Sequence, residues 1–135
     1  MTLLSSTDRP PFDLDAADAW WLSPERLFDG DTVRNGIALR IEAGRIAAVR
    51  PGSEAGVDGA PVWRTNCLAV PGFFDVQING GGGVLFNTTP TVEGLERIGA
   101  AHRASGTTAF LPTLITDAEE VMDRAADAAI AAFGR

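Results

Sequence analysis

The sequence predicts an α/β fold in which a small N-terminal β-sheet is followed by two strand–helix units. Two observations lead to this prediction. Residues 19–70 carry short strand-like segments separated by turns, whereas residues 71–135 alternate strand patterns with helix patterns. The residues before this sheet are polar, include a Pro-Pro pair and show no clear period, so we interpret residues 1–18 as a flexible tail.

The second segment is expected to form a small β-sheet domain. Residues 37–42 alternate between aliphatic and other side chains, which is the period of a half-buried strand. An Ala-Gly pair at 43–44 suits a tight turn, and residues 45–49 return as the second strand of a hairpin. With further short strands expected at 62–63 and 67–70, the pattern predicts a small antiparallel sheet.

The α/β segment begins at Pro71 with a strand expected over residues 73–79. A helix pattern follows over residues 91–105, with Thr89 or Thr91 as the candidate N-cap and glycine at its end. One face of this helix is apolar, formed by Val92, Leu95, Ile98 and Ala101. Residues 107–111 read as a second strand.

The second helix is expected over residues 118–133, where Thr116 and Glu119 have the spacing of a capping box. Its inward-facing residues are expected to be Val121, Met122, Ala125 and Ala129. Two strand–helix units cannot close a (β/α)8 barrel, which needs eight units and about 250 residues. Two parallel strands also leave both sheet edges unpaired. We therefore expect residues 71–135 to be the start of an incomplete barrel.

The composition indicates a globular protein and argues against two classes of partner. Hydrophobic residues make up 45% of the 135 residues, and the formal net charge is −7. All 11 basic residues are arginines scattered singly along the chain, so no basic patch exists for nucleic acid or an anionic membrane surface. With one cysteine, no signal-peptide pattern and no long apolar run, we expect a cytoplasmic protein.

The polar residues of the first barrel strand are the candidate site. Because side chains alternate along a strand, Asp75, Gln77 and Asn79 are expected on one face, with Phe74, Val76 and Ile78 on the other, facing the outer helices. In a barrel the polar face would look into the interior, and the carboxyl end of the strand is where such folds place their active sites. Alternation alone is equally compatible with an edge strand that faces water.

Residues near this strand end are weaker candidates. Gly80 and Gly81 would let the backbone approach a ligand closely, and their N–H groups could hold an anion. Thr113 follows the second strand and could line the same pocket. His102, the single histidine, is expected at the opposite end of the barrel with a structural or surface role, because helices run antiparallel to their strands. Cys67 reads as a small buried hydrophobe.

Two stretches resemble the N-acetylglucosamine-6-phosphate deacetylases of the amidohydrolase superfamily. They are PGFFDVQINGGGGVLFN from Pro71 and GTTAFLPTLITD from Gly106, supported by the hairpin EAGRIAAV from Glu42. Most of that superfamily carries His-x-His on the first barrel strand, whereas the deacetylases are similar to this chain in carrying Gln-x-Asn, here Gln77 and Asn79. In the family a small N-terminal sheet, part of a β-sandwich, precedes the barrel.

The resemblance implies hydrolysis of the acetamide of N-acetylglucosamine 6-phosphate to glucosamine 6-phosphate and acetate. It also implies a divalent metal, zinc foremost, in the complete enzyme. The family's ligands, a Glu in a His-Leu-Glu-Gly-Pro-like segment and two later His, have no matching positions here, and neither has the acid/base Asp. We therefore assign this chain no metal ligand and no catalytic residue. Gln77 and Asn79 are carried over as residues beside the metal.

Two main hypotheses about function follow; a third, that the chain belongs to another branch of the amidohydrolases, is weakened by the missing His-x-His. In the first, the chain is the N-terminal portion of such a deacetylase and is inactive alone, while the complete enzyme binds a small amino-sugar phosphate. In the second, it is a non-catalytic binding or assembly module derived from an amidohydrolase. The sequence leaves open which metal is used, which residues hold the phosphate and whether the complete enzyme forms homo-oligomers.

Overall fold

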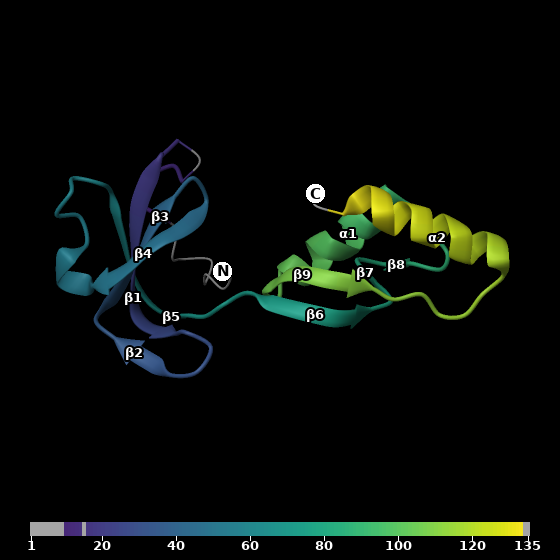
Figure 1. Cartoon of the computed structure of the whole chain (residues 1–135), viewed down its shortest axis with the longest axis horizontal. Coiled ribbons are helices and arrows are strands. Elements are labelled where there is room, and N and C mark those ends of the chain that lie inside the picture. Colours follow the sequence, from purple (N-terminus) through teal and green to yellow (C-terminus); the bar gives the residue numbers. More distant parts are fainter. Residues whose placement is uncertain (1–9, 15, 134–135) are drawn as a thin grey trace. The chain divides into compact units, whose positions relative to one another are not determined.

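The computed structural model describes residues 10–14 and 16–133, which form two compact units (Figure 1). The first unit, here called the β-sheet unit, ends at Pro71, and the second, the α/β unit, starts at Gly72. From the sequence this division was expected one residue earlier, between residues 70 and 71. Among the described residues, no helix is both long and apolar enough to cross a membrane.

The β-sheet unit is a five-stranded sheet arranged around its longest strand, β1. In chain order the strands are β1 (Ala19–Phe28), β2 (Val33–Asn35), β3 (Ile37–Glu42), β4 (Arg45–Pro51) and β5 (Val62–Ala69). The main path of the sheet is β2-β1-β3-β4, and β5 pairs with β1. The β1–β5 pair is parallel, so the expected purely antiparallel sheet is wrong: a crossover from β4 brings β5 back in the direction of β1.

The predicted hairpin is confirmed as β3 and β4, which pair antiparallel. Its turn residues Ala43 and Gly44 both have positive φ angles, 46° and 73°. This is the turn whose twist matches the twist of the flanking strands. The two short strands expected at 62–63 and 67–70 are one continuous strand, β5, because residues 64–66 also pair along β1 or bulge out beside it.

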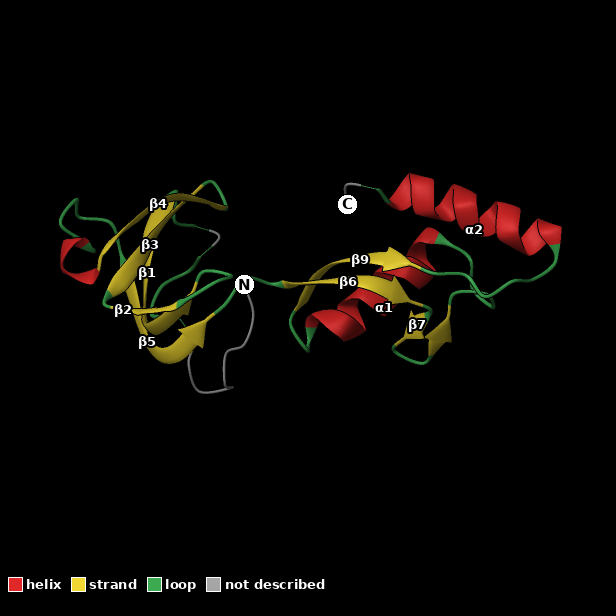
Figure 2. Ribbon diagram, turned by 60° about the horizontal axis from the view of Figure 1, so that its bottom comes forward, coloured by secondary structure: helices red, strands yellow, loops and turns green. Residues whose placement is uncertain are grey.

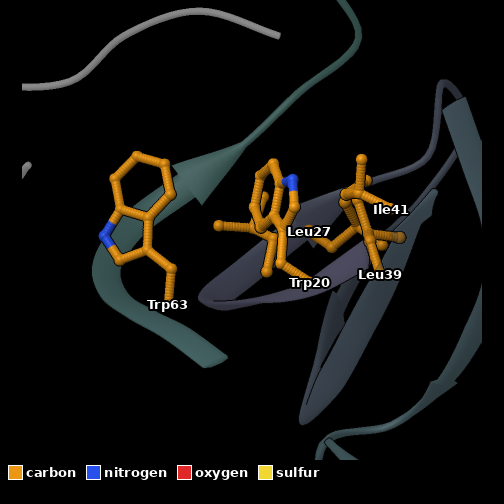
Figure 3. Packing of buried hydrophobic residues seen from close by; sticks show 6 residues of the cluster. Trp20, Leu27, Leu39, Ile41 and Trp63 are labelled. Atoms are coloured by element: carbon orange, nitrogen blue, oxygen red, sulfur yellow. The ribbon is translucent and has the colours of Figure 1, made fainter. Parts of the chain in front are cut away.

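One face of this sheet carries the core of the unit. Trp20 lies between Trp63 and the aliphatic side chains of β3, as Figure 3 shows. The ring centroids of the two tryptophans are 6.2 Å apart. The buried members of the cluster are Trp20, Leu22, Leu27, Leu39, Ile41 and Trp63.

The segment before β1 adds to this core, which differs from the expectation of a loose tail over residues 1–18. Phe12, Leu14 and Ala17 pack against the cluster, and the Phe12 ring meets Trp20 edge-on at 6.0 Å. These apolar side chains follow no helix or strand period, so their burial depends on the surface that the sheet offers. The rest of that segment, residues 1–9 and 15, lies outside the described residues.

The opposite face of the sheet is held by a polar cluster around Trp21. Its indole N–H donates to Asp58 Oδ1 at 3.0 Å, and the Arg40 guanidinium lies 5.5 Å from the centre of the ring. Arg40 also pairs with Asp58 Oδ2 at 2.9 Å. The hydrogen bond from Trp21, helped by the Ala60 N–H and by Arg40, holds the pKa of Asp58 below its usual value.

The α/β unit contains two parallel strands, two helices and a small hairpin (Figure 2). Its elements are β6 (Phe73–Ile78), β7 (Gly80–Gly81), β8 (Val84–Leu85), α1 (Val92–Arg103), β9 (Thr107–Pro112) and α2 (Glu119–Ala132). Strands β6 and β9 pair in parallel, as expected of a strand–helix–strand unit. The core joins both helices to the sheet and consists of Ile78, Phe86, Leu95, Ile98, Ala125 and Ala128.

The two helices begin in different ways. The Thr91 side chain accepts a hydrogen bond from the Gly94 N–H at 3.1 Å, so of the two candidates Thr89 and Thr91 it is Thr91 that caps α1. The capping box predicted for α2 is wrong, because Ala118 is the N-cap and makes no side-chain cap bond. Asp117 instead accepts the Ala118 N–H through Oδ1 at 2.9 Å.

The inward face of α2 also differs in part from the prediction. Ala125 is buried and Ala129 packs against the core, as expected. Met122 is instead exposed, and Ala128 is buried in addition. The contact with α1 is therefore made by small side chains, which allow two helices to approach closely.

Candidate functional site

The carboxyl ends of β6 and β9 lie side by side and bring two predicted site residues together. The Thr113 N–H donates to the Ile78 carbonyl at 2.8 Å, which continues the pairing of the strands by one residue. The Asn79 side chain donates through Nδ2 to the Thr113 carbonyl at 2.9 Å. Asn79 and Thr113 are both half-buried, so the amide of Asn79 fastens the two strand ends to each other.

The other two polar residues of β6 lie differently from the regular alternation that the sequence suggested. The pairing with β9 shifts between Asp75 and Ile78, so this stretch of β6 holds one residue more than its partner. Asp75 Oδ1 accepts the N–H of Gln77 at 3.0 Å within this irregular stretch. The Gln77 side chain is exposed and makes no hydrogen bond to any described residue, so its amide is free to meet a ligand.

The apolar side of β6 is covered only at its end. Ile78 is buried in the core, whereas Phe74 and Val76, expected to face outer helices, are each more than half exposed, as is Phe73. The reason is the width of the sheet: with two strands, α1 packs mainly beside β9 and the hairpin, and β6 is an edge.

The glycine segment forms a tight hairpin and is required by the fold itself. Gly80 and Gly81 pair with Leu85 and Val84, and the turn between them has positive φ angles. A Cβ atom at Gly80 would collide with the Val84 carbonyl oxygen. A Cβ atom at Gly81 would lie 2.8 Å from His102 Nε2. Close packing within the chain therefore explains both glycines without a ligand.

His102 lies against this hairpin, which corrects the expectation that it is remote from the glycine segment. Its Nε2 is 2.8 Å from the Gly80 carbonyl oxygen. The segment turns back after β6 and runs along α1, so it reaches a part of the helix that strand direction alone would place far away. The contact gives His102 a structural role in holding the hairpin.

Replacing Gly80 with alanine is expected to destabilise the α/β unit by about 1–3 kcal/mol, the usual cost of forcing atoms into a filled space. The clash is with backbone, which cannot rotate away as a side chain can. Thermal unfolding followed by circular dichroism measures the effect. Gly83→Ala is the matched control, because its new Cβ would find no atom closer than 3.9 Å and only the positive φ opposes it. Equal stability of G80A and wild type would contradict the structural role.

Asn87 and Asp117 are polar residues at the same strand ends that the sequence analysis did not select. Asn87 Nδ2 donates to the Ile115 carbonyl at 2.7 Å and to Asp117 Oδ2 at 2.8 Å. Asn87 Oδ1 accepts the Ile115 N–H at 3.1 Å. The bond from Asn87, together with that from the Ala118 N–H, lowers the pKa of Asp117. No local pattern connects positions 28 to 30 residues apart, so periodicity could not have found this cluster.

The described residues do not form a metal site by themselves. No group of three or more His, Cys, Asp or Glu side chains lies close enough to hold an ion within this part of the chain. In the β-sheet unit, an open depression of about 590 Å³ is lined in part by Phe12, Asp18 and Asp58. Asp58 is already engaged by Trp21 and Arg40.

Comparisons with known proteins give a consistent result, although no protein-family model matches the chain. The curated N-acetylgalactosamine-6-phosphate deacetylase of Shewanella sp. (strain ANA-3) is 58% identical over 64 residues, which is 47% of this chain. The N-acetylglucosamine-6-phosphate deacetylase of Haemophilus influenzae is 40% identical over 92 residues, 67% of this chain. Of these two relatives the aligned residues span only 16% and 23%.

Solved structures agree. The N-acetylglucosamine-6-phosphate deacetylase of Pasteurella multocida superposes with a TM-score of 0.69 at 28% identity, over 87% of this chain and 31% of its own. The chain is similar to an N-terminal portion of the N-acetylglucosamine-6-phosphate deacetylases. A mutant of the deacetylase from Mycobacterium smegmatis, in complex with N-acetyl-D-glucosamine-6-phosphate, gives a TM-score of 0.66 at 28% identity over 80% of this chain. The likeness to the deacetylases thus includes both the small sheet and the strand–helix units.

Proposed function

We propose that this chain forms the N-terminal portion of a deacetylase that hydrolyses the acetamide of an N-acetylhexosamine 6-phosphate. In that reaction the C–N bond breaks, water supplies a hydroxyl to the acetyl carbon and a proton to the amine, and acetate and the amino-sugar phosphate are released. The single observation that carries the proposal is the similarity to deacetylases in both sequence and fold. The proposal also includes that β6–α1 and β9–α2 are the first two strand–helix units of a (β/α)8 barrel.

The strand ends support the proposal at the level of residues. Gln77 offers a free amide, and Asn79 is fixed by its bond to Thr113, so the pair presents hydrogen-bonding groups at the carboxyl ends of parallel strands. Such ends are where barrel enzymes bind their substrates. In the complete enzyme we expect these residues to lie at the substrate site, with Asp75 and Thr113 nearby.

A divalent metal does not fit the described residues of this chain alone. The fold family implies such an ion, with zinc foremost, but the described His, Cys, Asp and Glu residues form no cluster of three. Under the proposal, the ion is held by residues that this chain does not contribute. We therefore expect the isolated chain to be inactive.

Which sugar epimer is the substrate is a separate question, and one observation favours the galactosamine derivative. The relative with 58% identity is named for N-acetylgalactosamine 6-phosphate, whereas the relative named for the glucosamine derivative is 40% identical. The two substrates differ only in the configuration of one hydroxyl group. Both epimers therefore belong in the test.

The test compares the isolated chain with the product of the longest open reading frame that contains it. We expect the longer protein to release acetate from at least one of the two N-acetylhexosamine 6-phosphates and to lose this activity after treatment with a chelator. The isolated chain should release none, with or without added zinc. Metal-dependent turnover by the isolated chain would refute its expected inactivity. A longer protein that hydrolyses neither epimer would overturn the proposed function and favour a non-catalytic module.

A further inference from the structure

We propose that Asn87 and Asp117 are positioning residues that hold the loop after β9 against the loop after β6. Their effect on catalysis rests on the proposed function, whereas their effect on the loop does not. The two residues touch no reacting atom under this proposal. They act through Thr113 and Asn79, the residues that stand at the joined strand ends.

The first argument is the way in which Asn87 binds Ile115. Its amide accepts the Ile115 N–H at 3.1 Å and donates to the Ile115 carbonyl at 2.7 Å. Both polar groups of one backbone residue are thus satisfied by a single side chain, as a neighbouring strand would satisfy them. Ile115 lies beyond the end of β9, and none of the described strands pairs with it. The side chain of Asn87 therefore continues strand-like hydrogen bonding past the end of β9 into the loop.

The second argument is that Asn87 itself is held firmly. The preceding residue, Phe86, is buried in the core, and its N–H donates to the Asn79 carbonyl at 2.8 Å. The N–H groups of Thr88 and Thr89 both donate to the Leu85 carbonyl, which closes a turn on the other side of Asn87. The backbone of Asn87, between the buried Phe86 and this turn, has little freedom, so its side chain can hold another loop in place.

The third argument is that Asp117 connects this contact to α2. One carboxylate oxygen accepts from Asn87 at 2.8 Å, and the other accepts the N–H of Ala118, the N-cap of α2, at 2.9 Å. Both donors favour the charged form and lower the pKa of Asp117. A negative charge here also complements the positive end of the helix dipole. The start of α2 and the loop after β9 are therefore fixed to the same asparagine.

The consequence for the candidate site follows from the position of the two contacts. Thr113 is tied to β6 by Asn79, and Ile115 is tied by Asn87, with Leu114 between them packed against the core. Three successive residues are thereby held. Removal of the Asn87 contact would free the loop from Ile115 onward. The Thr113–Asn79 contact would then be the remaining one of the two side-chain contacts that join these loops.

The direct test is amide hydrogen exchange in the isolated chain carrying Asn87→Ala. We expect exchange at Ile115 to accelerate about tenfold, the factor that corresponds to one or two net hydrogen bonds. Amides in the middle of α1 should keep their rates. Thr88→Ala is the matched control, because the bond of its hydroxyl among the described residues is to the Leu85 carbonyl within its own loop. Unchanged exchange at Ile115, or equal acceleration throughout the α/β unit, would overturn the positioning role.

A second variant, Asn87→Asp, tests the contact with Asp117 through pH. In the native chain the lowered pKa of Asp117 makes its stabilising contribution present above the unfolded value of 3.8 and lost as pH falls through the folded pKa. In N87D two carboxylates face each other, so the pKa of the pair rises and protection of Ile115 should increase on acidification from neutral pH. The first-turn residues Glu119 and Glu120 are unchanged in both proteins. The same pH response in N87D as in the native chain would count against the pairing.

Catalysis is tested in the longer protein used for the deacetylase assay. We expect Asn87→Ala to reduce kcat about 10- to 100-fold through misplaced site residues, with a smaller change in KM and an unchanged melting temperature of the β-sheet unit. If the longer protein is inactive on both epimers, the proposed function fails while the exchange result stands. If it is active and N87A retains native kcat and KM, the positioning role in catalysis fails.

Discussion

Replacing Trp63 with alanine is expected to destabilise the β-sheet unit by about 3–5 kcal/mol, the usual cost of removing a large buried aromatic side chain. Trp63 is 3% exposed and packs against Trp20, which lies between it and β3 (Figure 3). The cavity would open at the junction of β5 and β1, the two strands that hold the unit together. Of all core substitutions in this unit, we expect this one to have the largest effect.

Tryptophan fluorescence measures this loss selectively. The three tryptophans of the chain, at positions 20, 21 and 63, all belong to the β-sheet unit, so denaturant unfolding followed by fluorescence reports on that unit. Two tryptophans remain in W63A. The matched variant is Trp63→Phe, which keeps an aromatic ring. Because the buried Trp63 Nε1 has no hydrogen-bond partner among the described residues, phenylalanine loses no bond there and should cost much less. A W63A protein within about 1 kcal/mol of native stability would refute the assigned packing.

Replacing Ile98 with alanine is expected to destabilise the α/β unit by about 2–5 kcal/mol. Ile98 is 1% exposed and is the most deeply buried large side chain among the described residues. It lies on the inner face of α1, in the cluster that joins this helix to α2 and to Ile78 of β6. The loss of its side chain removes contacts from three elements at once, and the surrounding backbone can close only part of the cavity.

Ile130 allows a control in which the same isoleucine-to-alanine change is made at an exposed position. Ile130 lies on the other helix, α2, and is 75% exposed, so Ile130→Ala makes the same change without a cavity. We expect I130A to be neutral or slightly stabilising, because alanine is the better helix former. Unfolding followed by far-ultraviolet circular dichroism compares the two variants, since both helices lie in the α/β unit. Equal stability of I98A and I130A would contradict the core as described.

Patterns confined to neighbouring residues predicted much of the secondary structure. The alternation over residues 37–42 predicted the strand β3, because one face of that strand is buried. The Ala43–Gly44 pair predicted the turn that follows, because the turn depends on the φ angles of these two residues. The helical spacing of Leu95 and Ile98 gave the buried face of α1 in the same way. Thr91 was recognisable as one of two candidate caps because its partner, Gly94, is only three residues away.

The errors arose where a distant segment competes with a local pattern. Thr116 and Glu119 have the spacing of a capping box, yet α2 begins after Ala118 without a side-chain cap, and Asp117 just before it is bonded to Asn87 of another loop. The regular alternation of Asp75, Gln77 and Asn79 is interrupted because β6 must match a shorter stretch of β9. The glycines at 80 and 81 read as a ligand loop, whereas His102 and Val84 fill the space beside them.

Short local patterns were sufficient to predict the β3–β4 hairpin and its turn, the order β6, α1, β9, α2, the cap of α1 as one of two candidates, and the resemblance carried by Gln77 and Asn79. They did not predict β1, β2 or the small β7–β8 hairpin. The predicted features are encoded in short stretches, where local geometry and side-chain period decide the outcome. Three features became visible in the folded chain alone: β5 runs parallel to β1, the β7–β8 hairpin lies along α1, and Asn87 joins two loops. Each of these is a contact between segments separated by more than 20 residues, and the energy of such contacts depends on surfaces that exist only after folding.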